Sequence, residues 1–294
     1  MSRVNDELEA MTRLNKRAWE ETYRLSDAYV CQKGEIFDSI DETKVQESIE
    51  HIKNKPSQDR SVKIVNADPL EIAQILCEKN TVPLVVNAGS QNDPMKIVEN
   101  GASGPEWDLF RRSNLCNAID VDQMYPLYEG RALYFPDVTV FRNEKYDKIK
   151  PFKIAIMTIN PISRPGLIQT QNQGKIVEKY QSISDANRMR MRIDRMFELA
   201  LIKKHKCLII NDFGCDPILE NPVQEIIGFF NDALKKYPVK YVFFGIQQSK
   251  IDKIKNASKS KHRSKNKSRG TDSSECKNYI LFHKGIDRAV TVTK

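Results

Sequence analysis

Apolar residues recur at helical spacing near the start of the chain. Between residues 5 and 27 they return at intervals of three or four, as Leu8 and Met11 illustrate, which is typical of one or two amphipathic helices. The segment 41–54 has the same character, and its acidic start suits the positive end of a helix dipole. We therefore expect residues 1–60 to form a helical extension packed on the rest of the protein.

The pattern changes at Val62, where short apolar runs begin to alternate with longer amphipathic segments. The runs that predict strands cover residues 62–65, 83–88, 132–142, 152–160, 206–212, 239–246 and 278–283. The segments that predict helices cover residues 68–79, with Asp68 as N-cap, 184–204 and 222–236. Alternating strands and helices predict an α/β fold whose mixed central sheet is covered on both faces.

Two loops are the expected places for a binding site. In α/β sheets, ligands bind beyond the carboxyl ends of the strands. By this reasoning the candidates are residues 87–107, after strand 83–88, and residues 211–222, after strand 206–212.

Charge is concentrated in one segment. The chain of 294 residues has a formal net charge of +8, and residues 250–269 alone hold nine Lys or Arg and one Asp. Subtracting these from the 47 basic and 39 acidic residues leaves 38 of each. A Ser/Lys-rich stretch with few apolar residues predicts a disordered insertion at about 250–276. It is either a solvated insertion or an electrostatic tether for an acidic partner.

The six cysteines and four histidines form no recognisable metal site. The cysteines are scattered without a CxxC pair, and no spacing typical of zinc appears, so we expect no metal and no cofactor. The chain contains no apolar stretch long enough to span a membrane and no secretory signal at its start. We therefore expect an intracellular protein with reduced cysteines, in the cytoplasm, at the cytoskeleton or in the nucleus.

Several motifs, in order along the chain, carry a family resemblance. The segment GASGPEWDLFRRSNL (101–115) is similar to the pattern GAxAQEExLxRRSxL, and VVNAGSQNDP (85–94) to NFASxxNPGGG. The other matching segments are RAWEET (17–22), KIVNADPLEIAQIL (63–76), LYFPDVTVFRN (133–143) and CLIINDFGCDPILENP (207–222). Together they resemble the microbial-type poly(ADP-ribose) glycohydrolase family.

The resemblance implies a fold, a ligand and a set of site positions. The family's catalytic domain is a macrodomain-like three-layer α/β/α sandwich that binds ADP-ribose, and here it would occupy residues 61–294. The family-equivalent ligand-binding positions are Asn87, Gly101, Phe213, Gly214 and Cys215.

The departures from the family pattern fall where the chemistry should be. The family's glutamate pair, whose second member is the catalytic acid, corresponds to Glu106 and Trp107. An indole N–H donates a hydrogen bond but cannot give and take a proton as a carboxyl does. The family's glycine triplet, where backbone approaches ligand, corresponds to residues 95–97, Met-Lys-Ile.

The second loop departs as well. The family pattern GCGxFGN uses glycines so that backbone N–H groups can cradle a diphosphate. Here Asp216 replaces a glycine, Pro217 has no N–H to offer, and Leu219 fills another glycine position. The sequence therefore predicts a site that has lost its chemistry.

Several of these residues also have ordinary structural interpretations. We expect Trp107 to serve in packing or at an interface rather than to stack on adenine, and Cys215 to be a small buried residue rather than a nucleophile. Asn87 either hydrogen-bonds a ribose hydroxyl or caps the turn after its strand, and we favour the turn. One of Arg111 and Arg112 should pair with an acidic neighbour, and Arg142 has the same ambiguity. The arginines of RMRMRIDRMFELA (188–200) predict a solvated helix face or a partner surface.

Three functional hypotheses follow. The first is a catalytically inactive family member that acts as a structural or scaffolding component of a larger assembly. The second is an active ADP-ribosyl glycohydrolase, or an ADP-ribose reader, that uses Glu106. The third is a nucleic-acid-binding module acting through residues 250–269. Under the first, the expected partner of that segment is an acidic protein filament or a ribonucleoprotein, and ADP-ribose binding is disfavoured.

Overall fold

A central mixed sheet organises the protein in the computed structural model, which describes residues 2–54, 59–172, 174–247 and 276–288. The sheet contains seven strands in the order β1-β4-β5-β3-β8-β9-β2. Strands β5, β3, β8, β9 and β2 run parallel, whereas β4 is antiparallel to both β5 and β1. Along the chain the strands are β1 (Glu35–Phe37), β2 (Ser61–Val65), β3 (Leu84–Ala88), β4 (Ala132–Arg142), β5 (Lys148–Ile159), β8 (Cys207–Ile210) and β9 (Tyr241–Gly245).

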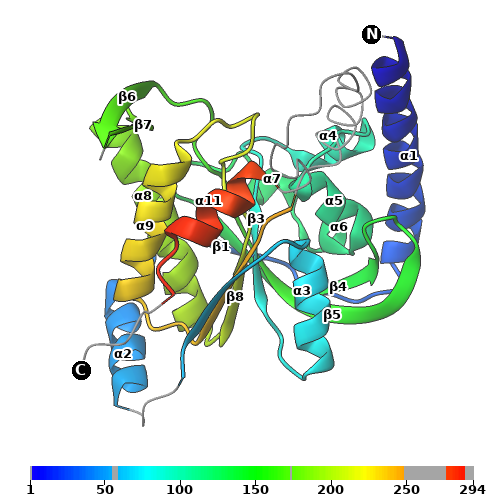
Figure 1. Cartoon of the computed structure of the whole chain (residues 1–294). Coiled ribbons are helices and arrows are strands. Elements are labelled where there is room, and N and C mark those ends of the chain that lie inside the picture. The colour runs from blue at the N-terminus through cyan, green and yellow to red at the C-terminus, as the bar shows by residue number, and fades with distance from the viewer. Residues whose placement is uncertain (1, 55–58, 173, 248–275, 289–294) are drawn as a thin grey trace.

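Helices cover both faces of this sheet, as Figure 1 shows. One face packs against α2 (Glu42–Lys53), α8 (Ile183–Ile202), α9 (Val223–Lys236) and α11 (Lys277–Gly285). The other face packs against α1 (Ser2–Ser26), α3 (Pro69–Glu78), α4 (Pro94–Glu99), α5 (Pro105–Arg112), α6 (Leu115–Ala118) and α7 (Val121–Met124). The expected three-layer α/β/α sandwich is confirmed.

Alternation along the strands divides the core into two layers. Within β3, the side chains of Leu84 and Val86 join the core under α8 and α9, while Val85 joins the core under α3 and α5. Successive side chains of a strand point to opposite faces of its sheet. A strand buried on both faces therefore reads as a continuous apolar run, which is why β3 could be predicted.

Helix starts follow the predicted side-chain chemistry. Asp68 is the N-cap of α3, where its carboxylate accepts hydrogen bonds from the backbone N–H groups of Leu70 and Glu71. Asp41 caps α2 in the same way, through Thr43 and Lys44. Such caps satisfy donors that a helix leaves unpaired at its first turn. The N-cap predicted at Asp68 is confirmed.

The strand predicted at residues 278–283 is wrong, because this segment is the helix α11. Its Phe282 is fully buried and lies 5.7 Å from Phe244 of β9 and 6.1 Å from Phe230 of α9, measured between ring centroids. A short apolar run does not by itself distinguish a strand from a buried helix. In the structure this segment is a helix, and its buried Phe282 packs on the sheet beside β9.

Some elements lay outside the sequence predictions. Strand β1, within the expected helical extension, pairs with β4, and a two-stranded hairpin is formed by β6 (Leu167–Asn172) and β7 (Lys175–Tyr180). The basic insertion predicted at about 250–276 lies outside the described residues, apart from Cys276, the N-cap of α11. Among the described residues, no helix has the length and apolarity to cross a membrane.

Candidate functional site

Four loops meet at the carboxyl end of the parallel strands. Those after β3, β5 and β8 lie there because these strands are parallel and adjacent. Residues 125–131 reach the same end, since Ala132 at the start of β4 pairs with Ile159 at the end of β5. The topology therefore brings the two candidate loops together.

Glu106 lies in the first turn of α5 and is buried, with 5% of its surface exposed. Its carboxylate accepts a hydrogen bond of 2.8 Å from the backbone N–H of Ser90 and one of 3.3 Å from the Asn87 side chain. Burial raises the pKa of Glu106 to about 7, although both hydrogen bonds favour the charged form. The site thus contains a carboxyl that can change protonation near neutral pH.

Asn87 anchors this carboxyl to the sheet. It lies inside β3, opposite Thr158 of β5, and its amide donates to Thr158 Oγ1 at 3.1 Å as well as to Glu106. The expectation that Asn87 caps the turn after its strand is therefore wrong. A buried amide needs partners, and here they come from helix α5 and strand β5.

Trp107 follows Glu106 but faces different surroundings. Its indole is half-buried and packs against the core on the α5 side of the sheet. A Cβ atom added at Gly104 would lie 3.2 Å from Trp107 Cδ1, so the ring rests on the backbone before α5. This position agrees with the packing role expected for Trp107.

The first candidate loop contains a helix where the family pattern has its glycine triplet. Met95, Lys96 and Ile97 lie within α4, and the Asp93 carboxylate accepts a 2.8 Å hydrogen bond from the Met95 N–H. Pro94, at the first helical position, contributes no N–H. The start of α4 therefore offers a ligand fewer backbone N–H groups, because Pro94 has none and that of Met95 already binds Asp93.

Gly101 packs against α1 and lies apart from Glu106. Its φ of +80° is left-handed, and an added Cβ would lie 2.7 Å from the carbonyl oxygen of Thr12. The Asn15 side chain donates to the Gly101 carbonyl at 3.1 Å. The glycine is thus explained by the close approach of two backbones.

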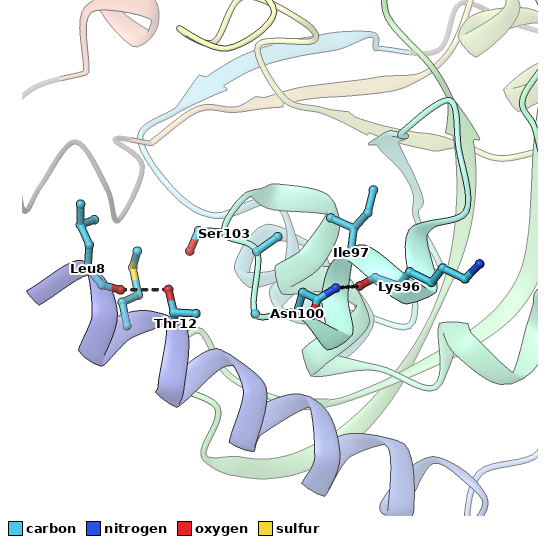
Figure 2. A pocket seen from close by; sticks show the side chains of 9 residues that line it. Leu8, Thr12, Lys96, Ile97, Asn100 and Ser103 are labelled. Carbon is cyan, nitrogen blue, oxygen red and sulfur yellow. Dashed lines mark hydrogen bonds between the residues drawn. The ribbon is translucent and has the colours of Figure 1, made fainter. Parts of the chain in front are cut away.

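A pocket of about 470 Å³ lies between α1 and α4. Figure 2 shows Leu8 and Thr12 of α1 on one side of it and Ile97, Asn100 and Ser103 on the other. Its lining includes none of Asn87, Glu106 and the 211–222 loop. Of the predicted site residues, only Gly101 contributes to this pocket.

The second candidate loop is closed by its own side chains. The Asp216 carboxylate accepts hydrogen bonds from the backbone N–H groups of Ile218, at 2.8 Å, and Leu219, at 3.3 Å. Gly214 has a φ of +77°, and its carbonyl accepts from the Asn221 side chain at 2.9 Å. The N–H groups of Ile218 and Leu219 therefore donate to a carboxylate of the loop itself.

Residues from distant segments brace this loop. Arg164, in the loop after β5, donates from its backbone N–H to the Leu219 carbonyl at 2.8 Å and from its side chain to the Ile218 carbonyl at 3.0 Å. Asn278 of α11 donates to Asp212 at 2.6 Å and to the Cys215 carbonyl at 2.8 Å. Sequence reasoning missed these braces because no local pattern marks side chains that join separate loops.

The other two predicted site residues of the second loop, Phe213 and Cys215, are buried. Phe213 is fully buried, and its N–H donates to the Asn211 side chain. Burial, Asp212 and Asp216 raise the pKa of the Cys215 thiol well above its usual value. A thiol held in its neutral form is a poor nucleophile, which agrees with the structural role expected for Cys215.

The arginines near α5 are structural. Arg112 pairs with Asp68 at 2.9 Å, and Arg111 lies 3.8 Å from Asp108, so the expected acidic partner is confirmed for both. Arg142 pairs with Glu21 of α1 at 3.2 Å. In α8, however, the predicted solvated face is wrong for Arg192, which is buried.

No group of three or more potential metal ligands from His, Cys, Asp and Glu occurs in the described part of the chain.

The first half of the chain matches a known family model. Residues 13–143 match the family model described as "Microbial-type PARG, catalytic domain". No match was found among curated proteins.

Solved structures of bacterial enzymes share the fold. Poly(ADP-ribose) glycohydrolase from Thermomonospora curvata, bound to the inhibitor ADP-HPD, superposes with a TM-score of 0.64 at 16% identity, covering 92% of this chain and 98% of the other. The Deinococcus radiodurans enzyme in complex with ADP-ribose gives a TM-score of 0.58 at 18% identity, covering 77% and 94%. At such identities the likeness concerns the fold.

Proposed function

Because residues 13–143 match the model of the microbial-type poly(ADP-ribose) glycohydrolase catalytic domain, we propose that this chain is a catalytically inactive member of that family and acts as a structural component of a larger assembly. The observation that carries the proposal is the side chain at position 107. The resemblance assigns the catalytic acid to this position, and Trp107 has no group that titrates as a carboxyl does. Losing a general acid typically lowers a rate by about 10² to 10⁴-fold.

The two loops supply independent support. Asp93 accepts from the Met95 N–H, and Asp216 accepts from the N–H groups of Ile218 and Leu219. A diphosphate needs such backbone donors, and it would have to compete with carboxylates that already hold them. It would also meet the negative charge of these carboxylates. Both effects disfavour ADP-ribose binding.

One observation favours the second hypothesis, an active or ADP-ribose-reading site built on Glu106. A carboxyl whose pKa is about 7 could serve as a general acid or base. The burial that raises this pKa also leaves only 5% of the residue exposed. Gly89 and Ser90 lie against this carboxylate, so contact with substrate would require them to move.

Two assays test the proposal. We expect purified protein to release no ADP-ribose from poly(ADP-ribose) above background and to give no heat on calorimetric titration with ADP-ribose. The Thermomonospora curvata enzyme is the positive control for release. Turnover by the unmodified chain that Glu106→Gln abolishes would establish the second hypothesis, and binding without turnover would identify a reader.

For the assembly partner, the support is the charge of residues 250–269. Nine basic residues there attract an acidic surface, most strongly at low ionic strength. Lysines in such a run discriminate little between sequences, so the folded part would fix the orientation on an acidic filament or ribonucleoprotein. Co-sedimentation with microtubules and with RNA, across a salt series, compares the full chain with one lacking residues 250–269. Equal binding by both chains excludes the tether, and binding to RNA alone favours the nucleic-acid hypothesis.

A further inference from the structure

The arginines of α8, predicted to form a solvated face or a partner surface, do not all lie in solvent. Arg188, Arg192 and Arg195 are spaced by four and three residues, so they lie on one face of the helix. Arg190 lies elsewhere on α8, where it pairs with Asp232 and covers the Phe229 ring at 4.4 Å. Arg192 is 2% exposed, which is unusual for a charged residue.

Two of these arginines have buried donors without a hydrogen-bond partner. In the described part of the chain, Nε and Nη1 of Arg192 and Nη1 of Arg195 are buried and have no hydrogen-bond partner. Arg195 does donate from Nη2 to the Asp38 carbonyl, at 3.0 Å. Burying charged donors without acceptors is costly, and burial lowers the pKa of Arg192.

The surroundings bring positive charge together on the α8 face of the sheet. Arg188 and Arg195 both disfavour the charged form of Arg192, whereas Glu129 and Tyr180 favour it. Glu129 is an exposed residue of the 125–131 loop, and its carboxylate is paired with Arg188. The next residue in that loop, Gly130, leaves room for Arg195, since a Cβ there would lie 3.3 Å from Arg195 Nη1.

We propose that Arg192 and Arg195 form a binding site for a small phosphate-class oxyanion, which enters where Glu129 pairs with Arg188. The fork of N–H donors in a guanidinium matches the oxygens of a phosphate, and arginine stays charged where lysine would lose its proton. Glu129 supplies a carboxylate at the entrance, and its exposure allows it to move aside for the ligand.

This site contains no residue of the two predicted ADP-ribose loops, 87–107 and 211–222. Glu106 belongs to α5, on the other face of the sheet from α8. Met189 of α8 does lie close to the 211–222 loop, because its Cε would lie 3.3 Å from a Cβ at Gly214.

Thermal unfolding and calorimetric titration with inorganic phosphate and with diphosphate, at constant ionic strength set by chloride, test the proposal. We expect a saturable rise in Tm for the unmodified chain, because a ligand that binds only the folded state stabilises it. Arg192→Met should raise Tm without phosphate, since it removes an unpaired buried charge. It should also weaken phosphate binding by at least about tenfold.

Matched variants separate this site from general charge effects. Arg190→Met removes the same charge outside this face and should keep the phosphate response. Glu129→Gln should strengthen phosphate binding, because it removes the competing carboxylate at the entrance. The proposal is overturned if phosphate has no effect on the unmodified chain, or if Arg192→Met responds to phosphate as that chain does. A response to diphosphate alone would assign the site to the larger anion.

Discussion

The buried carboxylate of Glu106 accepts a hydrogen bond of 3.3 Å from the side chain of Asn87, which ties the first turn of α5 to strand β3. This contact joins Asn87, a family-equivalent ligand-binding position, to Glu106, the retained member of the family's glutamate pair. In the structure, Asn87 and Glu106 are hydrogen-bonded to each other, and Asn87 also donates to Thr158.

The pKa of Glu106 makes stability depend on pH. In the folded protein it is raised from 4.5 to about 7, so the folded state binds this proton more tightly than the unfolded state does. The contribution of Glu106 to the unfolding free energy is therefore fully present below about pH 4.5 and is lost as pH rises towards 7. Above about pH 7 it no longer changes, and the total loss is about 3 kcal/mol. Urea unfolding between pH 5 and pH 8, with pH values spaced by about one unit, measures this change.

Glu106→Gln should abolish that pH dependence and leave the variant more stable than the unmodified chain at pH values above about 7. Glu99→Gln, which removes an exposed carboxylate of α4, is the matched control and should keep the dependence. Parallel stability curves for the unmodified chain and Glu106→Gln would show that Glu106 is ionised throughout.

Restoring the missing carboxyl should not restore catalysis. We expect Trp107→Glu to release no ADP-ribose from poly(ADP-ribose), because Asp93 and Asp216 still occupy the backbone donors of both loops. Combining it with Asp216→Gly frees the N–H groups of Ile218 and Leu219, and any recovered turnover should appear only in this combination. Turnover by Trp107→Glu alone would show that the loops still bind substrate.

Gly214 should tolerate no side chain. Gly214→Ala places a Cβ 2.8 Å from Asn221 Nδ2 and 2.9 Å from Pro161 Cβ, at a φ of +77°. The left-handed backbone costs about 1–2 kcal/mol and the contacts add to it. Gly228→Ala is the control, because a Cβ there meets nothing within 4 Å, and it should be neutral or slightly stabilising. Equal unfolding free energies for the two variants would contradict the loop conformation.

Phe282 tests the helix at the end of the described chain. Phe282→Ala removes a fully buried ring that contacts Phe230 and Phe244, and should lower the unfolding free energy by about 3–5 kcal/mol. His283→Ala, at the exposed neighbouring position, should change it by no more than about 0.5 kcal/mol. Similar losses for both would argue against the helical packing of this segment.

Much of the fold could be predicted because the chain repeats simple periodic patterns. The continuous apolar run of β3 and the acidic cap of α3 at Asp68 depend on neighbours in sequence, so local reasoning found both. The family motifs likewise located Asn87 and Glu106 and showed that position 107 lacks a carboxyl. Residue identity alone determines that an indole cannot act as a titrating acid.

Other features depended on contacts between segments far apart in the sequence. Residues 278–283 form a helix because Phe282 packs on rings from α9 and β9. Asn278 and Arg164 hold the 211–222 loop from two different directions. From the sequence, Arg192 is one of several arginines on an amphipathic helix, and its burial became evident only in the folded structure. The sequence determined which groups the protein possesses, whereas burial, which sets their pKa values and their need for partners, was decided by the tertiary structure.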